Sequence, residues 1–220
     1  GKQSFLTSLS TSKIPLIGIT GPPGAGKSTL ITSLIKQWVG QDKRMAILSV
    51  DPSSPFHSGA ILGDRIRMKE WYLHPNVFIR SLSSRGHLGG VNASMKDLIT
   101  FMQSTSFDVV IIETVGVGQS EVEIARLVPL TIVVLVPEAG DDVQMMKSGL
   151  IEVADIFVVN KSDRPEADHF ASHLQNSVHE KSHNKNPIVL QTVATIDKGV
   201  AELSSQILSR FSTNDKQHNP

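Results

Sequence analysis

The sequence predicts an α/β fold, with a mainly parallel sheet and helices on both faces. Two observations favour this class. Short apolar runs rich in β-branched residues alternate with longer stretches whose apolar residues recur at helical spacing. A glycine-rich loop stands between the first such run and the first helical stretch, and no internal repeat interrupts the order. Alternation of this kind is typical of βαβ units, which cover both faces of a parallel sheet with helices.

The expected elements follow one another along the chain. Strands are predicted over residues 14–20, 44–50, 77–82, 108–113, 130–136, 154–160 and 187–192. Helices are predicted over residues 28–39, 59–72, 91–104, 142–153, 165–182 and 198–210, with a loop and a short helix that reach about residue 127. We expect one domain over residues 14–211, between a polar N-terminal segment at 1–13 and a frayed tail at 212–220.

Composition narrows the class of partner and the compartment. The 220 residues carry a formal net charge of +0, which favours neither nucleic acid nor an anionic membrane as a partner. The chain has no cysteine, which excludes disulfides and thiolate metal sites. No apolar run approaches the roughly 20 residues of a membrane span. The chain begins with Gly rather than Met, so it is left open whether a targeting segment has been removed. We expect a cytoplasmic protein, or one of the mitochondrial matrix if such a segment is removed.

A glycine-rich loop, GPPGAGKS at residues 21–28, has the spacing G-x-x-x-x-G-K-S between a strand and a helix. Its glycines allow backbone N–H groups to surround an anion, and the helix start adds its positive dipole end. We expect Lys27 to reach the β- and γ-phosphates of a nucleotide and Ser28 to bind Mg²⁺. A structural glycine turn is the alternative. The pattern predicts a P-loop NTPase whose phosphate-binding residues are Gly21, Pro22, Pro23, Gly24, Ala25, Gly26, Lys27, Ser28 and Thr29.

A second loop, NKSD at residues 160–163, follows the strand 154–160 at the sheet edge where ligands bind. The carboxylate of Asp163 can accept two hydrogen bonds from the N1–H and 2-amino groups of guanine, a pair that adenine does not offer. Asn160 can bond the base and the neighbouring loop, and the stem of Lys161 can cover the ring face. An ordinary polar turn is the alternative. Together with the phosphate loop, this motif predicts a switch that binds and hydrolyses GTP.

Carboxylates stand at the ends of two further strands. Mg²⁺ prefers octahedral oxygen ligands and keeps several waters. We therefore expect Ser28, Asp51, Asp64 and Glu113 to form the metal site with its attacking water. Gly116 has the place of a glycine whose N–H meets the γ-phosphate. The predicted catalytic residues are Lys27, Asp51, Asp64 and Glu113.

Seven runs carry a resemblance to a known family. They are GITGPPGAGKSTL, VDPSSP, ILGDRIRM, FIRSLSSRGHLGG, ETVGVGQSE, PEAGDDVQMMKSG and EVADIFVVNKSD, and they lie between residues 18 and 163. The chain resembles the methylmalonyl-CoA mutase-associated GTPases, also named lysine/arginine/ornithine-transport ATPases, within the SIMIBI class of P-loop proteins. The resemblance implies a G-protein chaperone that gates the loading of adenosylcobalamin onto methylmalonyl-CoA mutase and protects that enzyme. It also implies a third switch loop that couples nucleotide to mutase, with Asp141, Gln144 and Lys147.

The chain departs from this family in several places, of which two bear on the site and on assembly. The loop that usually reads Ser-Ala is Val193-Ala194 here, so the Ala194 N–H is expected at guanine O6 without a serine hydroxyl nearby. The chain also ends shortly after its last helix, without the long helical arm that members use to dimerise. A homodimer is therefore left open, and an isolated monomer or weak dimer is expected.

Several weaker signals stand beside these motifs. Val117 has the place where Ras-like enzymes have a water-orienting Gln, which predicts slow intrinsic hydrolysis, with Gln119 as one candidate substitute. Histidines spaced four apart in the helix 165–182, such as His169 and His173, are expected to be solvated rather than metal-binding. His87 and Pro129 have no derived role. The alternative functions are a nickel-inserting metallochaperone GTPase, a transport-linked ATPase or kinase, and a nucleotide-binding scaffold without useful turnover.

Overall fold

The structure is a computed structural model that describes residues 14–51, 68–83, 88–114, 122, 125–137, 150–181 and 186–212. Seven strands within these residues form one sheet in the order β3-β2-β4-β1-β5-β6-β7. Each strand is parallel to its neighbours. The predicted α/β class is confirmed, and the described sheet is parallel throughout.

The strands lie within two residues of the predicted ranges. They are β1 (Leu16–Thr20), β2 (Met45–Asp51), β3 (Val77–Ser83), β4 (Val109–Thr114), β5 (Leu130–Leu135), β6 (Ile156–Asn160) and β7 (Ile188–Thr192). In β1, β4, β5 and β6 every residue is buried. A strand that is covered on both faces has no need of polar alternation, which explains why these runs are almost continuously apolar.

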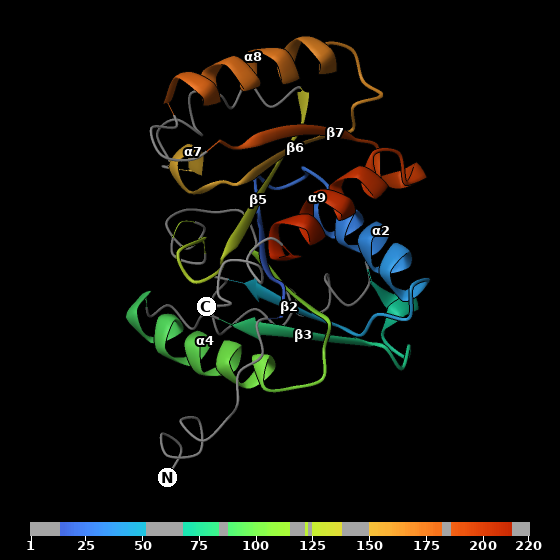
Figure 1. The fold of residues 1–220 in the computed structure, drawn as a ribbon, viewed down its shortest axis with the longest axis vertical. Coiled ribbons are helices and arrows are strands. Elements are labelled where there is room, and N and C mark those ends of the chain that lie inside the picture. Colours follow the sequence, from blue (N-terminus) through green and yellow to red (C-terminus); the bar gives the residue numbers. More distant parts are fainter. Residues whose placement is uncertain are drawn as a thin grey trace.

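Helices cover both faces of the sheet, as predicted (Figure 1). The helices are α2 (Lys27–Val39), α4 (Leu88–Gln103), α7 (Leu150–Val153), α8 (Ala167–Lys181) and α9 (Val200–Ser212), and the 3₁₀ turns are η1 (Lys69–Trp71) and η3 (Ala194–Ile196). On one face α2 and α9 lie side by side, where the buried Nε1 of Trp38 donates to Oγ of Ser204 at 2.7 Å. On the other face α4 packs near β2 and β4, and α7 and α8 pack near β5 and β6.

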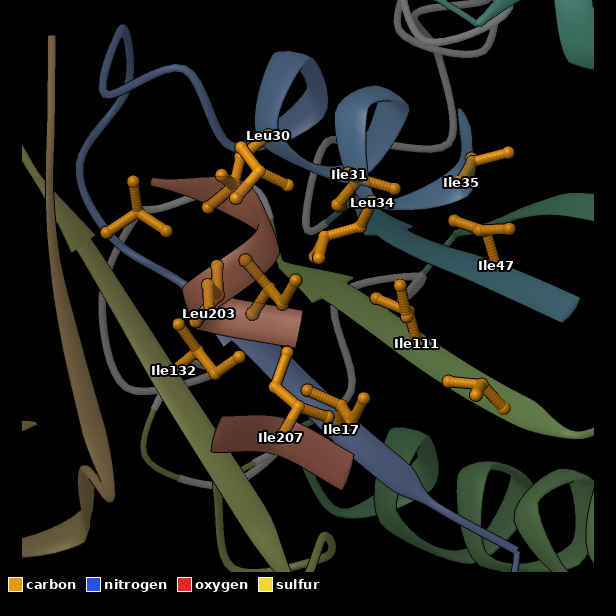
Figure 2. Close-up of a cluster of buried hydrophobic side chains, with 14 of the residues drawn as sticks. Ile17, Leu30, Ile31, Leu34, Ile35, Ile47, Ile111, Ile132, Leu203 and Ile207 are labelled. Atoms are coloured by element: carbon orange, nitrogen blue, oxygen red, sulfur yellow. The ribbon is translucent and has the colours of Figure 1, made fainter. Parts of the chain in front are cut away.

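The largest core cluster fills the space between the sheet and the pair α2 and α9. Ile17 in β1 points to this side, while the preceding Leu16 points to the α4 side, as strand alternation requires. Figure 2 shows side chains of α2 and α9 meeting those of the strands. Its labelled members are Ile17, Leu30, Ile31, Leu34, Ile35, Ile47, Ile111, Ile132, Leu203 and Ile207, all fully buried. This packing fixes α2, and with it the loop that precedes it.

The helix predicted over residues 59–72 is wrong for its described part. Residues 59–67 lie outside the described residues, and the following stretch forms only the 3₁₀ turn η1. Successive bonds from Trp71 N to Met68 O and from His74 N to Trp71 O keep the chain in tight turns. Pro75 lacks an N–H and disfavours helix in the residue before it, so the chain turns into β3 instead of continuing a helix.

Two further predicted helices fall only partly within the described residues. Of the helix expected over 142–153, only α7 is described. The short helix expected before residue 127 is seen at residues 122 and 125, where Arg126 N bonds Val122 O at 3.2 Å. Within the described ranges, no helix combines the length and the apolar character needed to span a membrane.

Candidate nucleotide site

The turn between β1 and α2 requires glycine at both ends. Gly21 has φ +137° and Gly26 has φ +88°, conformations that L side chains rarely adopt. A Cβ at Gly21 would overlap the carbonyl oxygen of Val134 in β5, and a Cβ at Gly26 would overlap the side-chain nitrogen of Asn160. The loop is therefore pressed against both the neighbouring strand and the predicted base loop.

Lys27 opens helix α2 and is 8% exposed. Its Nζ donates to the carbonyl oxygens of Gly21 at 2.7 Å and Pro22 at 3.0 Å, which keeps the ammonium within the loop. Gly26 caps the helix start without a side-chain hydrogen bond. The first N–H groups of a helix have no partner inside it and carry the positive end of the helix dipole. This combination of loop, cation and helix start suits a phosphate group.

The remaining loop residues differ in exposure. Ala25 and Ser28 are buried, whereas Pro23, Gly24 and Thr29 are exposed. Pro23 and Gly24 lie in the turn itself, and Thr29 lies in the first turn of α2.

A buried carboxylate lies beside the start of α2. Oγ of Ser28 donates to Oε1 of Glu113 at 2.7 Å, and Oγ of Ser49 approaches Oε2 at 3.4 Å. Glu113 is 4% exposed and stands in register with Ile19 of β1 and Ser49 of β2. The chain thus brings two of the four predicted metal ligands, Ser28 and Glu113, into direct contact. A buried hydroxyl and a carboxylate are oxygen donors of the kind that Mg²⁺ prefers, so these residues fit the metal.

Asn160 at the end of β6 joins three segments that are distant in sequence. Its Nδ2 donates to the carbonyl oxygen of Ala25 in the phosphate loop at 2.9 Å. Its Oδ1 accepts from Oγ1 of Thr192 at 3.0 Å and from the backbone N–H of Ala194 at 3.2 Å. The residue is 2% exposed, so these bonds satisfy a buried amide. The phosphate loop and the predicted base loop therefore belong to one connected structure.

Lys161 and Asp163 follow at the open edge of the sheet. Lys161 has φ +58°, and its Nζ donates to the carbonyl oxygen of Gly24 at 2.8 Å, so that its stem runs from β6 toward the phosphate loop. Asp163 is exposed in the turn after β6. Ala194 begins η3, where its N–H already meets Asn160. Asn160 thus contacts Ala194 directly, Lys161 contacts the phosphate loop, and Asp163 is exposed two residues further along the chain.

The switch residues that the sequence singled out lie mostly outside the described residues. Of Asp51, only the backbone position at the end of β2 is described, paired with Ser83. The residues outside the described ranges are Asp64, His87, Gly116, Val117, Gln119, Asp141, Gln144 and Lys147. Their roles stay predictions.

The structure adds polar residues that the motifs did not indicate. Thr192 is fully buried and donates its hydroxyl to Asn160. It directly precedes Val193, which stands where the family usually has a serine. Ser49 approaches Glu113 from β2, two residues before Asp51 on the same strand. The hydroxyls of Thr114 and Thr20 bond each other at 2.8 Å where β4 and β1 end. A signal was present in each case, because all four stand at or near the carboxyl ends of strands.

A charged contact joins α2 to the loop after β7. The hydroxyl of Ser33 donates to one carboxylate oxygen of Asp197, and the ammonium of Lys36 donates to the other. The hydrogen bond from Lys36, and then the one from Ser33, lower the pKa of the Asp197 carboxyl from its ordinary 3.8. The bond to Asp197 and its negative charge raise the pKa of the Lys36 ammonium from its ordinary 10.5. Asp197 was not predicted, because no motif contains it.

The histidine pair on α8 agrees with its predicted solvated state. His169 and His173 are exposed. Among the described residues, no group of three or more His, Asp or Glu side chains is arranged to hold a metal ion. Pro129 is exposed before β5, and the structure gives it no role.

The family follows from comparison with known proteins. The model of the family described as methylmalonyl-CoA mutase-associated GTPase MeaB matches residues 4–218. The chain belongs to the MeaB family. A Pyrococcus horikoshii relative is 47% identical over 203 residues, which are 90% of this chain and 64% of that protein. The GTPase ArgK of Escherichia coli is 39% identical over 198 residues, 87% of this chain and 60% of its own length.

A mouse relative named methylmalonic aciduria type A homolog, mitochondrial, is 44% identical over 147 residues. That match covers 67% of this chain and 35% of the mouse protein. The chain thus spans less than two thirds of the length of the curated MeaB-family relatives it matches.

Solved structures confirm the predicted P-loop NTPase fold. The crystal structure of a LAO/AO transport system kinase has a TM-score of 0.74 and 29% identity, over 96% of this chain and 64% of that chain. HypB from Helicobacter pylori, in complex with nickel, has a TM-score of 0.65 and 16% identity, over 97% of this chain and 92% of that chain. The second likeness is one of fold alone.

Proposed function

We propose that this MeaB-family protein binds and hydrolyses GTP and serves an adenosylcobalamin-dependent acyl-CoA mutase, in the first place methylmalonyl-CoA mutase. In this proposal it gates cofactor loading and protects the mutase. The observation that carries the nucleotide part is the buried Asn160, which bonds both the phosphate loop and the loop of Ala194. The family description supports the partner. The domain would be the single unit 14–211, in the cytoplasm or, as with the mouse relative named mitochondrial, in mitochondria.

Base choice rests on Asp163. Asp163 is exposed in the turn that follows Asn160 and Lys161, and its carboxylate would accept from the N1–H and 2-amino groups of guanine. The Ala194 N–H, now directed at Asn160, would be shared with guanine O6. Each hydrogen bond to a charged group contributes roughly 1.5–3 kcal/mol, so two predict a preference of about 10² or more for GDP over ADP. Titration calorimetry with the two nucleotides measures it.

Hydrolysis rests on the other end of the site. Lys27 and the helix start would hold the β- and γ-phosphates. Ser28 and Glu113 would hold Mg²⁺, with Asp51 and Asp64 completing its ligand and water network. When bound, the metal supplies charge neutralisation for the departing phosphate. Glu113, fixed by hydroxyls on both oxygens, would present its carboxylate in one orientation without reorganisation during the reaction.

The partner role is tested by comparing hydrolysis with and without mutase. Val117 predicts slow turnover of the protein alone, so a partner is expected to accelerate it by ordering the switch segments. Lys147→Ala, with Asp141 and Gln144 on the same predicted helix face, is expected to keep basal hydrolysis near wild type and to lose part of the acceleration. If the cognate mutase accelerates neither protein, the chaperone proposal fails. If it accelerates both equally, the chaperone stands and Lys147 is not a coupling residue.

A transport-linked kinase is the second candidate, because a LAO/AO transport system kinase shares this fold at 29% identity. It predicts binding of ATP. Comparable affinities for GDP and ADP in the same calorimetry would favour it over the GTPase proposal. The nickel alternative has a fold likeness to HypB and nothing further.

A further inference from the structure

The loop that carries Ala194 is a small closed unit. Val193 N donates to Lys198 O at 3.0 Å and Lys198 N donates back to Val193 O at 3.3 Å, so residues 193–198 form one compact turn. Gly199 leaves this turn with φ +76°, where a Cβ would overlap the carbonyl oxygen of Gln191. A unit closed in this way moves as a whole, so its attachments decide where the Ala194 N–H lies.

Besides the packing of Ala194 in the core cluster that contains α2, the unit has two polar side-chain attachments among the described residues. On its inner side, the Ala194 N–H donates to the buried Asn160. On its outer side, Asp197 accepts from Ser33 and Lys36, on the second and third turns of α2. Val193, at the place of the family's serine, is buried and has an apolar side chain that can add no hydrogen bond. If the Asp197 side chain were removed, the bond from the Ala194 N–H to Asn160 would be the remaining polar side-chain contact of this unit among the described residues.

The outer attachment leads to the phosphate end of the site. Helix α2 begins at Lys27, directly after the phosphate loop, and is packed rigidly against the core. A contact between α2 and the Ala194 unit therefore sets the span between the phosphate-binding helix start and the base-binding N–H. Because a diphosphate nucleotide must reach both ends at once, an error in that span would weaken the base contact first.

We propose that Asp197 is a positioning residue for guanine recognition, which holds the Ala194 unit against α2. The proposal rests on the proposed binding of guanine nucleotides. Asp197 adopts φ +56°, a left-handed conformation that Asp tolerates better than most residues and that glycine adopts freely. Its side chain can therefore be removed without backbone strain.

The test compares two glycine substitutions at matched positions. Asp197→Gly removes the contacts with Ser33 and Lys36 and keeps the left-handed backbone. Asp42→Gly is the control, because Asp42 is also exposed, lies just after the other end of α2 and has φ +57°. Asp197→Asn is the milder variant, since it keeps an acceptor for Ser33 and loses the charge that Lys36 pairs with. The ligands are GDP, ADP and 2-aminopurine riboside diphosphate, which lacks both the 6-oxygen and the N1 proton of guanine.

The readout for each ligand is the ratio of its dissociation constants for variant and wild type. For GDP we expect Asp197→Gly to weaken binding by roughly threefold to fivefold, the upper part of the range of an exposed ion pair, with Asp197→Asn in between and Asp42→Gly near 1. For the analogue without the 6-oxygen, we expect Asp197→Gly to stay within about twofold of wild type, because the Ala194 N–H has no partner there.

Three results are possible that would each contradict a different claim. If wild type binds GDP and ADP equally, the guanine proposal itself fails. If wild type prefers GDP but Asp197→Gly binds it as tightly as Asp42→Gly, Asp197 does not position the loop. If Asp197→Gly weakens the binding of GDP and of 2-aminopurine riboside diphosphate by the same factor, Asp197 contributes to general stability and not to base recognition. Should Asp197→Gly fold poorly, Asp197→Asn decides by the same ratios.

Discussion

The two ends of the nucleotide site are built in different ways. At the phosphate end the loop bonds are local, because Lys27 reaches carbonyls five and six residues back in its own turn. At the base end the bonds are long-range, since Asn160 joins residues 135 and 34 positions away. The phosphate loop itself is formed by one strand, one turn and one helix, and Glu113 of β4 meets it at Ser28. The second end exists only when β6, β7 and the phosphate loop have come together.

This difference separates what each end tolerates. A local turn depends on the conformation of a few glycines, so its integrity is set by φ angles and close approach. An assembled end depends on one buried amide whose loss leaves several groups unpaired. Substitutions at the two ends should therefore fail by different mechanisms, which the following variants distinguish.

The largest effect is expected where the local loop meets a distant strand. Glu113→Gln keeps the size of the side chain and a contact for Ser28, but it removes the charge beside the predicted metal. We expect GTP hydrolysis to fall about 10²-fold or more, with GDP affinity within about fivefold of wild type, because the lost charge acts mainly on the transition state. Single-turnover hydrolysis and calorimetry measure the two. A variant that hydrolyses GTP at the wild-type rate would remove Glu113 from the catalytic set.

The assembled end is tested by Asn160→Ala. This change leaves Ala25 O, the hydroxyl of Thr192 and the N–H of Ala194 without their common partner in a buried place. We expect a loss of about 2–4 kcal/mol in the free energy of unfolding, measured by urea denaturation without nucleotide. Asn160→Asp is the comparison variant, since it keeps the acceptor for Thr192 and Ala194 but replaces the donor to Ala25 with a buried negative charge that faces a carbonyl oxygen. A loss below about 0.5 kcal/mol in Asn160→Ala would show that the Asn160 bonds do not hold the base end together.

The local end is tested by a pair of glycine substitutions. Gly24→Ala and Gly26→Ala both place a side chain at positive φ, +80° and +88°, at a shared cost of roughly 1–2 kcal/mol. At Gly24 a Cβ meets nothing within 4 Å, whereas at Gly26 it overlaps Asn160. We therefore expect Gly26→Ala to lower stability and GDP affinity further than Gly24→Ala, by the same two measurements. Equal losses would mean that backbone conformation, and not the contact with the base end, limits the loop.

The same contrast explains what the sequence could predict. The fold class, the strand ranges and the phosphate loop were predictable because each depends on local periodicity or on a motif of eight residues. The direct contact of Ser28 with Glu113 was predictable in outline, since parallel strands end at one edge of the sheet. The contact of the Asp197 carboxylate with α2 was not predictable, because no motif contains Asp197 and its position is not at the end of a strand. The helix predicted over residues 59–72 was wrong for its described part, residues 68–72, because the turn that leads to Pro75 outweighed their helical spacing.

The smallest effect is expected from the exposed ion pair between Lys36 and Asp197. The direction in which its contribution to stability changes with pH follows from the two pKa shifts. The lowered pKa of Asp197 means that its contribution to stability is complete above its ordinary 3.8 and is lost as pH falls through the lowered value. The raised pKa of Lys36 means that its contribution is complete below its ordinary 10.5 and is lost as pH rises through the raised value.

We therefore expect the urea midpoints of wild type and Asp197→Asn to differ by a constant amount between about pH 5 and pH 9, and to converge at both extremes. The difference is expected to be small, because the two side chains are 66% and 44% exposed, and to shrink in high salt. Asp42→Asn, at an exposed position after the other end of α2, is the control and should keep its urea midpoint close to that of wild type. A difference that is independent of pH and salt would mean that the Asp197→Asn substitution alters the turn itself, in which case the two ends are held together by Asn160 and by core packing rather than by this ion pair.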